Sequence, residues 1–422
     1  MKSRRDFIQK VTAGLALPGL VSFAPSNEKK VQKINQNLTN EEFWDQIRGQ
    51  FPLTKERAYL NNGTFGPATY SVMKAMEESY LHINTTGEYG HTDQEREKLA
   101  SFLGVKTNEL SLTHNTTEGI NIMAWGISLQ AGDEVIVTKH DHAGNALPWL
   151  NRAKLHGIVL KTFEPKATQE ENLTLIQSLT TQRTKVLAIP HVTCTTGLVF
   201  PIKEISEFAR NRGVITAIDG AHGAGSFNLN IKDLDCDFYA GCCHKWMNGP
   251  SGTAFLYVRE DMLERLQPFH IGGASDSGWD MTSIPPILKG YAESAHRFDY
   301  GTQSTTLMKG VSAAIDFQLE IGKEKIESRV RELNQYLFEN LLQFGNKIEM
   351  LSSAEAKSRI SMVSFRPKNA SYQQVGNELG KMGFRIRQVP EGGVNAIRIS
   401  THIYNSKEEL DRLIQKLPGI LG

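Results

Sequence analysis

The chain has 422 residues, which is enough for two domains or one large one. It holds 47 Lys and Arg against 46 Asp and Glu, so its net charge of +1 gives no sign of a nucleic acid or an anionic surface as partner. Its four cysteines have neither the spacing of a zinc site nor the density of a disulfide scaffold.

Residues 1–25 have the pattern of an export signal. The pair Arg4-Arg5 precedes a moderately apolar stretch in which Pro18 and two glycines make a poor membrane span. This order predicts a twin-arginine signal peptide and a periplasmic protein. The alternative is a disordered arm on a cytoplasmic protein. Residues 26–65 then predict a polar linker and a segment that packs on a smaller, C-terminal domain.

Strands and helices alternate through the middle of the chain. Helices are expected at residues 40–48 and 67–83. Mostly apolar runs predict seven strands, at residues 109–114, 133–139, 158–163, 185–190, 214–219, 237–241 and 253–258. Helices are predicted between several of them, at residues 118–129, 145–156, 171–180 and 202–212. This order predicts an α/β fold with a mostly parallel seven-stranded sheet between helices. The last two strands have no helix between them, which leaves room for one to run antiparallel.

The pattern changes after the seventh strand. Residues 271–286 are rich in Gly, Ser and Asp and predict a mobile loop at the site. Beyond residue 306, further helices are predicted at residues 325–344, 373–382 and 406–416, with strands at 360–366 and 396–400. We therefore expect a large domain over residues 66–300 and a smaller α+β domain over residues 301–422.

Two charged residues stand where predicted strands end. Asp219 closes one apolar run and Lys245 closely follows another. In an open α/β sheet, ligands bind at the carboxyl ends of the strands. A carboxylate and an amine that converge there suit pyridoxal phosphate, because Lys forms a Schiff base with its aldehyde and Asp holds a proton on its ring nitrogen. For Lys245 alone, an exposed lysine at a strand end remains the alternative.

Thr116 and Thr117 open the helix that follows the first strand of the sheet. The unpaired amides of a helix N-terminus, with two hydroxyls beside them, form a natural phosphate site. An ordinary threonine N-cap is the alternative.

Other polar residues are candidates for the same site. His142 follows a strand and could stack on a cofactor ring, relay protons, or belong to a metal site with His140 and Asp141. His222, three residues after Asp219, could bind the cofactor's phenolic oxygen or be a satisfied core histidine.

Two residues are candidates for binding the substrate. Arg398 lies within an apolar strand, where its guanidinium needs a carboxylate from the substrate or an internal ion pair. Asn62, in a Gly- and Pro-containing loop, is the second candidate.

Taken together, these passages resemble the class V aminotransferase family of fold-type I pyridoxal-phosphate enzymes. The similarity covers residues 58–413 and is carried by several stretches: Asp219-Gly220-Ala221-His222, the run 233–239, His244-Lys245, residues 249–252, Arg398-Ile399-Ser400 and residues 402–405. His191-Val192-Thr193 and His244-Lys245-Trp246 are similar to the isopenicillin N epimerase-like branch.

The resemblance implies a role for each matching residue. Lys245 would carry the cofactor as a Schiff base, Asp219 would pair with its ring nitrogen, and His142 would stack on the ring. Thr116 and Thr117, with His244 beside them, would bind the phosphate.

The resemblance also implies a homodimer with shared active sites, since Thr302 matches a residue that reaches the phosphate of the other subunit. Arg398 would bind the substrate carboxylate.

Cysteine positions separate this chain from cysteine desulfurases. Those enzymes carry a catalytic cysteine shortly before the arginine strand, whereas no cysteine follows Cys243 here. Cys194 and Cys242 also stand where relatives have Asn and a phosphate-binding Ser. The expected function is therefore an aminotransferase or epimerase acting at the α-carbon of an amino-acid-like or peptidic substrate. A C–S lyase, a periplasmic siderophore- or peptide-tailoring enzyme, and a non-catalytic small-molecule binder are the alternatives.

Overall fold

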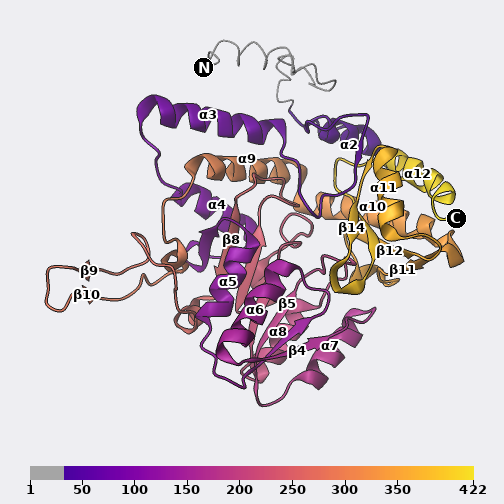
Figure 1. The fold of residues 1–422 in the computed structure, drawn as a ribbon. Helices are drawn as coiled ribbons and strands as arrows, with labels where there is room; N and C mark the ends of the chain where they lie inside the picture. The colour runs from indigo at the N-terminus through magenta and orange to yellow at the C-terminus, as the bar shows by residue number, and fades with distance from the viewer. Residues whose placement is uncertain (1–32) are drawn as a thin grey trace, which may run out of the picture. The chain divides into compact units, whose positions relative to one another are not determined.

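Seven strands form the central sheet of the computed structural model, which describes residues 33–422 (Figure 1). Their order across the sheet is β2 (Leu110–Thr113), β8 (Ala254–Val258), β7 (Phe238–Cys242), β6 (Ile215–Asp219), β5 (Thr184–Pro190), β3 (Glu134–Thr138) and β4 (Val159–Phe163). Only β8 runs antiparallel to its neighbours. The predicted mostly parallel sheet is thus confirmed. The predicted signal peptide lies outside the described residues.

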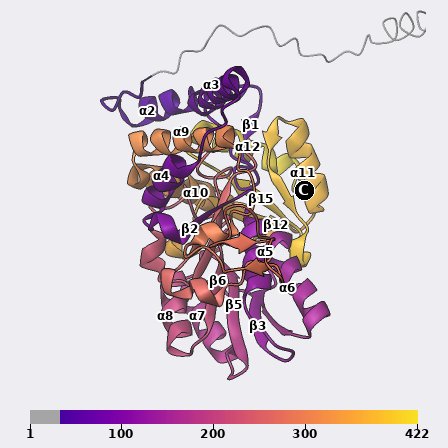
Figure 2. The same cartoon turned by 90° about the vertical axis from the view of Figure 1, so that its left-hand side faces the viewer.

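Helices cover both faces of this sheet and bury its strands, apart from the edge strand β4. Helices α5 (Thr116–Gly126) and α6 (Ala143–His156) lie on one face, and α7 (Gln169–Leu179) and α8 (Ile202–Asn211) lie on the other (Figure 2). Neighbouring residues of β6 show the alternation, since Ala217 packs into the core under α5 and Ile218 into the core under α8. Burial on both faces holds the strand ends in fixed positions.

Three further helices, α3 (Tyr70–Thr86), α4 (Asp93–Leu103) and α9 (Thr305–Ile321), pack on one another beside the large sheet. Helices α3 and α4 both pack against α9. Figure 1 shows α3 lying along α9 near the top of the view. No helix in residues 33–422 is both long and apolar enough to cross a membrane.

A second, four-stranded antiparallel sheet forms from the C-terminal part of the chain. Its order is β11 (Ile348–Met350), β12 (Met362–Pro367), β15 (Ala396–Ser400) and β14 (Arg387–Val389). Its helices are α10 (Lys323–Leu342), α11 (Tyr372–Lys381) and α12 (Lys407–Lys416). This arrangement agrees with the predicted α+β class of this region, while the exact domain boundaries stay predictions.

Short elements tie the rest of the chain to these sheets. Helix α2 (Asn40–Arg48) precedes β1 (Ala58–Tyr59), which pairs in parallel with β13 (Phe384–Arg385). Strands β9 (Trp279–Asp280) and β10 (Ile287–Leu288) form a hairpin that projects from the sheet region (Figure 1). The sequence predicted only a loop there, because two-residue strands leave no periodic pattern.

Candidate active site

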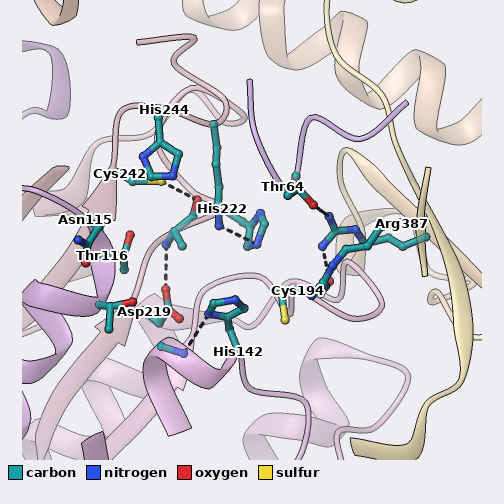
Figure 3. Close-up of a pocket in the computed structure, with 16 residues that line it drawn as sticks. Thr64, Asn115, Thr116, His142, Cys194, Asp219, His222, Cys242, His244 and Arg387 are labelled. Atoms are coloured by element: carbon teal, nitrogen blue, oxygen red, sulfur yellow. Dashed lines mark hydrogen bonds between the residues drawn. The ribbon is translucent and has the colours of Figure 1, made fainter. Parts of the chain in front are cut away.

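The parallel strands of the large sheet end at a cavity of about 210 Å³. Residues that follow five strands line it: Thr116 after β2, His142 after β3, Cys194 after β5, Asp219 at the end of β6, and Lys245 after β7. Arg398 reaches the cavity from the second sheet, and Gly63 and Thr64 reach it from the loop after β1. Figure 3 shows His244, Cys242, Asn115 and Thr116 at one end, with Thr64 and Arg387 at the other.

The amine of Lys245 lies beside His222 in this cavity. Its Nζ is 3.5 Å from His222 Nε2, while Trp246 Nε1 donates to His222 Nδ1 at 3.2 Å. Burial and the nearby Lys245 hold the pKa of His222 well below its ordinary value, so the ring is neutral. Since Nδ1 accepts a hydrogen bond, the ring proton sits on Nε2 and faces Lys245. That proton can be donated to the lone pair of an uncharged amine.

Asp219 is the acidic group of the cavity. It is 6% exposed, and its Oδ1 accepts a hydrogen bond from the Ala221 amide at 3.0 Å. Burial raises its pKa, whereas the Ala221 amide, Lys245 and His142 lower it. A proton shared with a bound ring nitrogen would compensate for the burial of this carboxylate.

The end of the cavity formed by Asn115, Thr116 and His244 offers hydrogen-bond donors to a phosphate. Asn115 caps α5 by accepting from the Glu118 amide at 2.9 Å, which leaves the helix N-terminus facing the cavity. Thr116 Oγ1 and His244 Nδ1 are buried and have no nitrogen or oxygen partner in the described part of the chain. Buried polar atoms without partners are costly, so they indicate a polar ligand at this end.

His142 caps α6 and presents its ring to the cavity. Its Nδ1 accepts from the Gly144 amide at 3.0 Å, and part of the residue stays exposed to solvent. Burial of part of the ring and the charge of Lys245 lower its pKa. A side chain on Gly144 would place its Cβ 2.4 Å from Thr117 Oγ1, so glycine permits the close approach of α6 to α5.

Arg398 is held rigidly at the substrate side of the cavity. It is 1% exposed; its Nη1 donates to the Cys194 carbonyl at 2.6 Å and its Nη2 to Thr64 Oγ1 at 3.0 Å. Burial lowers its pKa, and so does the neighbouring Arg387. Its Nε has no partner among the described residues. A substrate carboxylate would satisfy this cation.

Two predicted residues do not line the cavity. Asn62 is buried behind it, where its Nδ2 donates to the Lys245 carbonyl at 3.3 Å and its Oδ1 accepts from Tyr404 at 2.9 Å. Asn62 thus supports the lysine loop. Thr302 is exposed at the start of the segment before α9. Its predicted action on the partner subunit's phosphate site stays a prediction.

Sequence reasoning missed Arg387, which lines the cavity beside Arg398. The two arginines are register partners on β14 and β15. The alternation of buried Phe384 and Ile386 with Arg385 and Arg387 is the signal that could have revealed it. Cys242 Sγ lies 3.5 Å from the Ala221 carbonyl and lines the cavity.

The cavity fits pyridoxal phosphate at three points. Lys245 supplies the amine for the aldehyde, Asp219 the carboxylate for the ring nitrogen, and the α5 N-terminus with Thr116 and His244 the donors for the phosphate. In residues 33–422 no group of three or more His, Cys, Asp and Glu side chains could hold a metal ion.

Comparisons with known proteins point to the same chemistry. Residues 59–413 match the family described as "Aminotransferase class-V". The chain is 30% identical over 399 residues to an isopenicillin N epimerase of Streptomyces clavuligerus, covering 90% of this chain and 98% of that protein. It is 29% identical over 412 residues to a cysteine desulfurase of Pectobacterium atrosepticum, covering 90% of this chain and 98% of the relative.

Solved structures show the same fold. The chain matches the cystine C–S lyase C-DES, solved with its reaction product cysteine persulfide, with a TM-score of 0.80 and 25% identity over 88% of this chain and 100% of the other. Another structure of C-DES, a variant with glycine covalently linked to the pyridoxal-phosphate cofactor, matches with a TM-score of 0.81 at 25% identity, covering 88% of this chain and 99% of the other.

Proposed function

The chain belongs to the class V aminotransferase family, whose cofactor is pyridoxal phosphate, and from this premise we propose that it acts at the α-carbon of an amino-acid-like substrate. The proposed reaction is transamination or epimerisation. The observation that carries the proposal is the convergence of Lys245, Asp219 and Arg398 on one cavity. Together these side chains supply a base, a proton-holding carboxylate and a carboxylate receptor.

Each side chain has a separate task in this proposal. Arg398 binds the α-carboxylate of the substrate and so fixes the bonds of the α-carbon relative to Lys245. When bound, pyridoxal phosphate withdraws electrons from that carbon. Lys245 Nζ takes the proton from the α-carbon, and Asp219 keeps a proton on the ring nitrogen. His142 covers one face of the ring and excludes water from it.

A C–S lyase is the second candidate, and the comparisons support it equally. Relatives of this chain include cysteine desulfurases, and the fold matches a cystine C–S lyase. The segment between β13 and β15 contains no cysteine, and none occurs after Cys243. A lyase reaction here would therefore have to release its sulfur product directly, without a protein thiol on that segment.

Hydrogen exchange at the α-carbon tests the proposal. The protein loaded with pyridoxal phosphate is incubated in D₂O with D- and L-glutamate, D- and L-alanine, and L-cystine, and products are followed by NMR. Loss of the α-proton is expected for at least one amino acid. Appearance of the enantiomer marks epimerisation, a 2-oxo acid marks transamination, and pyruvate with ammonia from cystine marks the lyase.

The Lys245→Ala variant provides the decisive comparison. Removing a general base slows exchange by about 10²- to 10⁴-fold. Lys416→Ala changes an exposed lysine of α12 and should exchange as fast as the unmodified protein. Exchange at an undiminished rate in Lys245→Ala would exclude the proposed role of this residue.

A further inference from the structure

A second cavity of about 1140 Å³ adjoins the active site. Thr64 and Arg387 line both cavities, so the second cavity borders the active site at these two residues. The second cavity runs between α11, strands β13 and β14, and the segment around β1. It therefore provides space for a part of the substrate that extends beyond the reacting carbon.

Four arginines mark this route from the interior to the surface. Arg398 is buried, Arg387 is half-buried, and Arg385 and Arg57 are exposed. Strand register fixes this order. Arg387 pairs with Arg398 across β14 and β15, and Arg385 pairs with Tyr59 across β13 and β1. Arg57 immediately precedes β1, so it lies beside this pair of strands.

The phenol of Tyr59 lies in the electric field of three of these cations. Burial raises the pKa of Tyr59, while Arg385, Arg57 and Arg398 each lower it. Tyr59 therefore lies within electrostatic reach of three arginines, and its hydroxyl donates to the Phe65 carbonyl at 2.8 Å. Positive charge is concentrated at this junction of the two cavities.

Acidic side chains of the groove leave this charge only partly neutralised. Lys381 pairs with Glu378 at 2.7 Å, and one terminal nitrogen of Arg387 pairs with Glu391. The other terminal nitrogen of Arg387, Nη1, is buried with no partner in the part of the chain that the structure describes. Within the same residues, neither Arg57 nor Arg385 is within ion-pair distance of an acidic group.

We propose that this groove, lined by Arg57, Arg385 and Arg387, binds an anionic extension of the substrate. The inference rests on the proposed function, because it places the α-carboxylate on Arg398 and the reacting carbon at Lys245. The substrate class is then an amino acid whose side chain continues into a carboxylate-bearing tail, as an acidic γ-linked peptide does. Arginine forks bind such carboxylates through paired hydrogen bonds.

Two peptides of matched size test the proposal. γ-L-Glutamyl-L-glutamate offers tail carboxylates, and γ-L-glutamyl-L-glutaminamide has the same shape without them. Their binding to the protein loaded with pyridoxal phosphate is measured by calorimetry at low and at physiological salt. The acidic peptide should bind about tenfold more tightly at low salt, with a preference that shrinks as salt is added.

Matched double variants locate the effect. Arg57→Gln with Arg385→Gln should remove most of the preference for the acidic peptide. Arg212→Gln with Arg412→Gln removes the same charge from exposed positions outside the groove and should retain the preference. Equal binding of the two peptides, or a preference that survives the first pair of changes, would overturn the proposal.

The same measurements separate this inference from the proposed function. If no amino acid exchanges its α-proton but the acidic peptide still binds through Arg57 and Arg385, the groove stands and the proposed reaction falls. If amino acids react but the tail charge has no effect on affinity, the reaction stands and the groove assignment falls. If neither peptide binds and no amino acid reacts, both are wrong.

Discussion

Two buried carboxyl groups, Asp219 and Asp141, lie at the carboxyl ends of β6 and β3, and burial raises the pKa of both. Burial raises the pKa of Asp219, and the Ala221 amide, Lys245 and His142 offset part of this rise. For Asp141, burial is the largest effect, and together with the nearby Asp219 it raises the pKa to about 8. At neutral pH, Asp141 is thus protonated and does not compete with Asp219 for the positive charge of a bound ring.

The raised pKa of Asp141 predicts a pH-dependent stability. Its pKa is about 8 in the folded protein and roughly 3.9 in an unfolded chain. Between those values the folded state holds a proton that the unfolded state has released, so this group destabilises the protein as pH rises. Asp141→Asn has no such proton. The stability of the unmodified protein should therefore fall relative to that of Asp141→Asn between about pH 5 and about pH 9, and the difference in the free energy of unfolding should change by about 4 kcal/mol in favour of the variant.

Urea unfolding of both proteins at a series of pH values measures this gain. Asparagine retains an oxygen that can accept from the Thr138 amide, as Asp141 Oδ2 does at 3.1 Å, so the fold should be preserved. Parallel pH curves for the two proteins would show that Asp141 is ionised in the folded state.

Site residues could be predicted from the sequence where they lie at or just after the end of a buried, apolar strand of the large sheet. Asp219, Lys245, Thr116 and His142 all follow buried strands of the large sheet, and each lines the cavity. Arg387 escaped prediction because its signal, the alternation of buried Phe384 and Ile386 with Arg385 and Arg387, spans two short strands and is easily overlooked in a single sequence. Asn62 was expected to bind substrate, but only the tertiary fold reveals that Tyr404 and the Lys245 carbonyl occupy its amide.

Among the elements, the buried strands of the large sheet were the most predictable. Their apolar runs are bounded by polar or glycine-containing turns, so the observed ends differ from the predicted ones by only a residue or so. Helix α4 was missed because its sequence, Asp93–Leu103, combines charged and apolar residues without a strong period. It forms because tertiary packing against α9 buries Leu99 and Leu103.

The loop at Gly66 contacts the turn at Lys245 so closely that one methyl group added to Gly66 should disturb that turn. Gly66 donates its amide to the His244 carbonyl at 2.9 Å, and a Cβ on it would lie 1.8 Å from the Lys245 carbonyl oxygen. Gly66→Ala must displace this turn. We expect it to weaken cofactor binding about tenfold and to destabilise the fold by about 1–3 kcal/mol.

Cofactor affinity is measured by titrating the apoprotein with pyridoxal phosphate and following the absorption of the bound form. Gly273→Ala is the matched control, because no atom lies within 4 Å of its Cβ and its backbone has no positive φ. Undiminished cofactor affinity in Gly66→Ala would mean that the turn does not depend on this contact.

At the scale of the whole molecule, apolar side chains remain exposed on several elements of the described chain. They include Tyr80 and Leu81 of α3, Leu147 of α6, and Trp279 and Met281 at the β9–β10 hairpin. These side chains belong to separate elements, and exposed apolar side chains of this kind are buried when another protein covers them. We propose that a second copy of the chain covers them, forming a homodimer in which Thr302 reaches the phosphate site of the partner.

Mixed dimers test whether active sites are shared between subunits. A chain with Lys245→Ala is co-expressed with a differently tagged chain carrying Thr302→Arg, and the heterodimer is purified through both tags. If Thr302 acts across the interface, one of the two sites combines an intact Lys245 with an intact Thr302. The other site carries both changes. The heterodimer should then recover about half of the unmodified α-proton exchange rate, although each variant homodimer is defective.

The alternative gives the opposite result, because a Thr302 that acts within its own chain leaves no intact site in the heterodimer. Exchange no faster than the mean of the two variant homodimers would therefore rule out sharing. A purified protein with the mass of a single chain would exclude the dimer itself. Measuring that mass by light scattering, with and without pyridoxal phosphate, completes the test, since a cofactor bound by both subunits should stabilise the dimer.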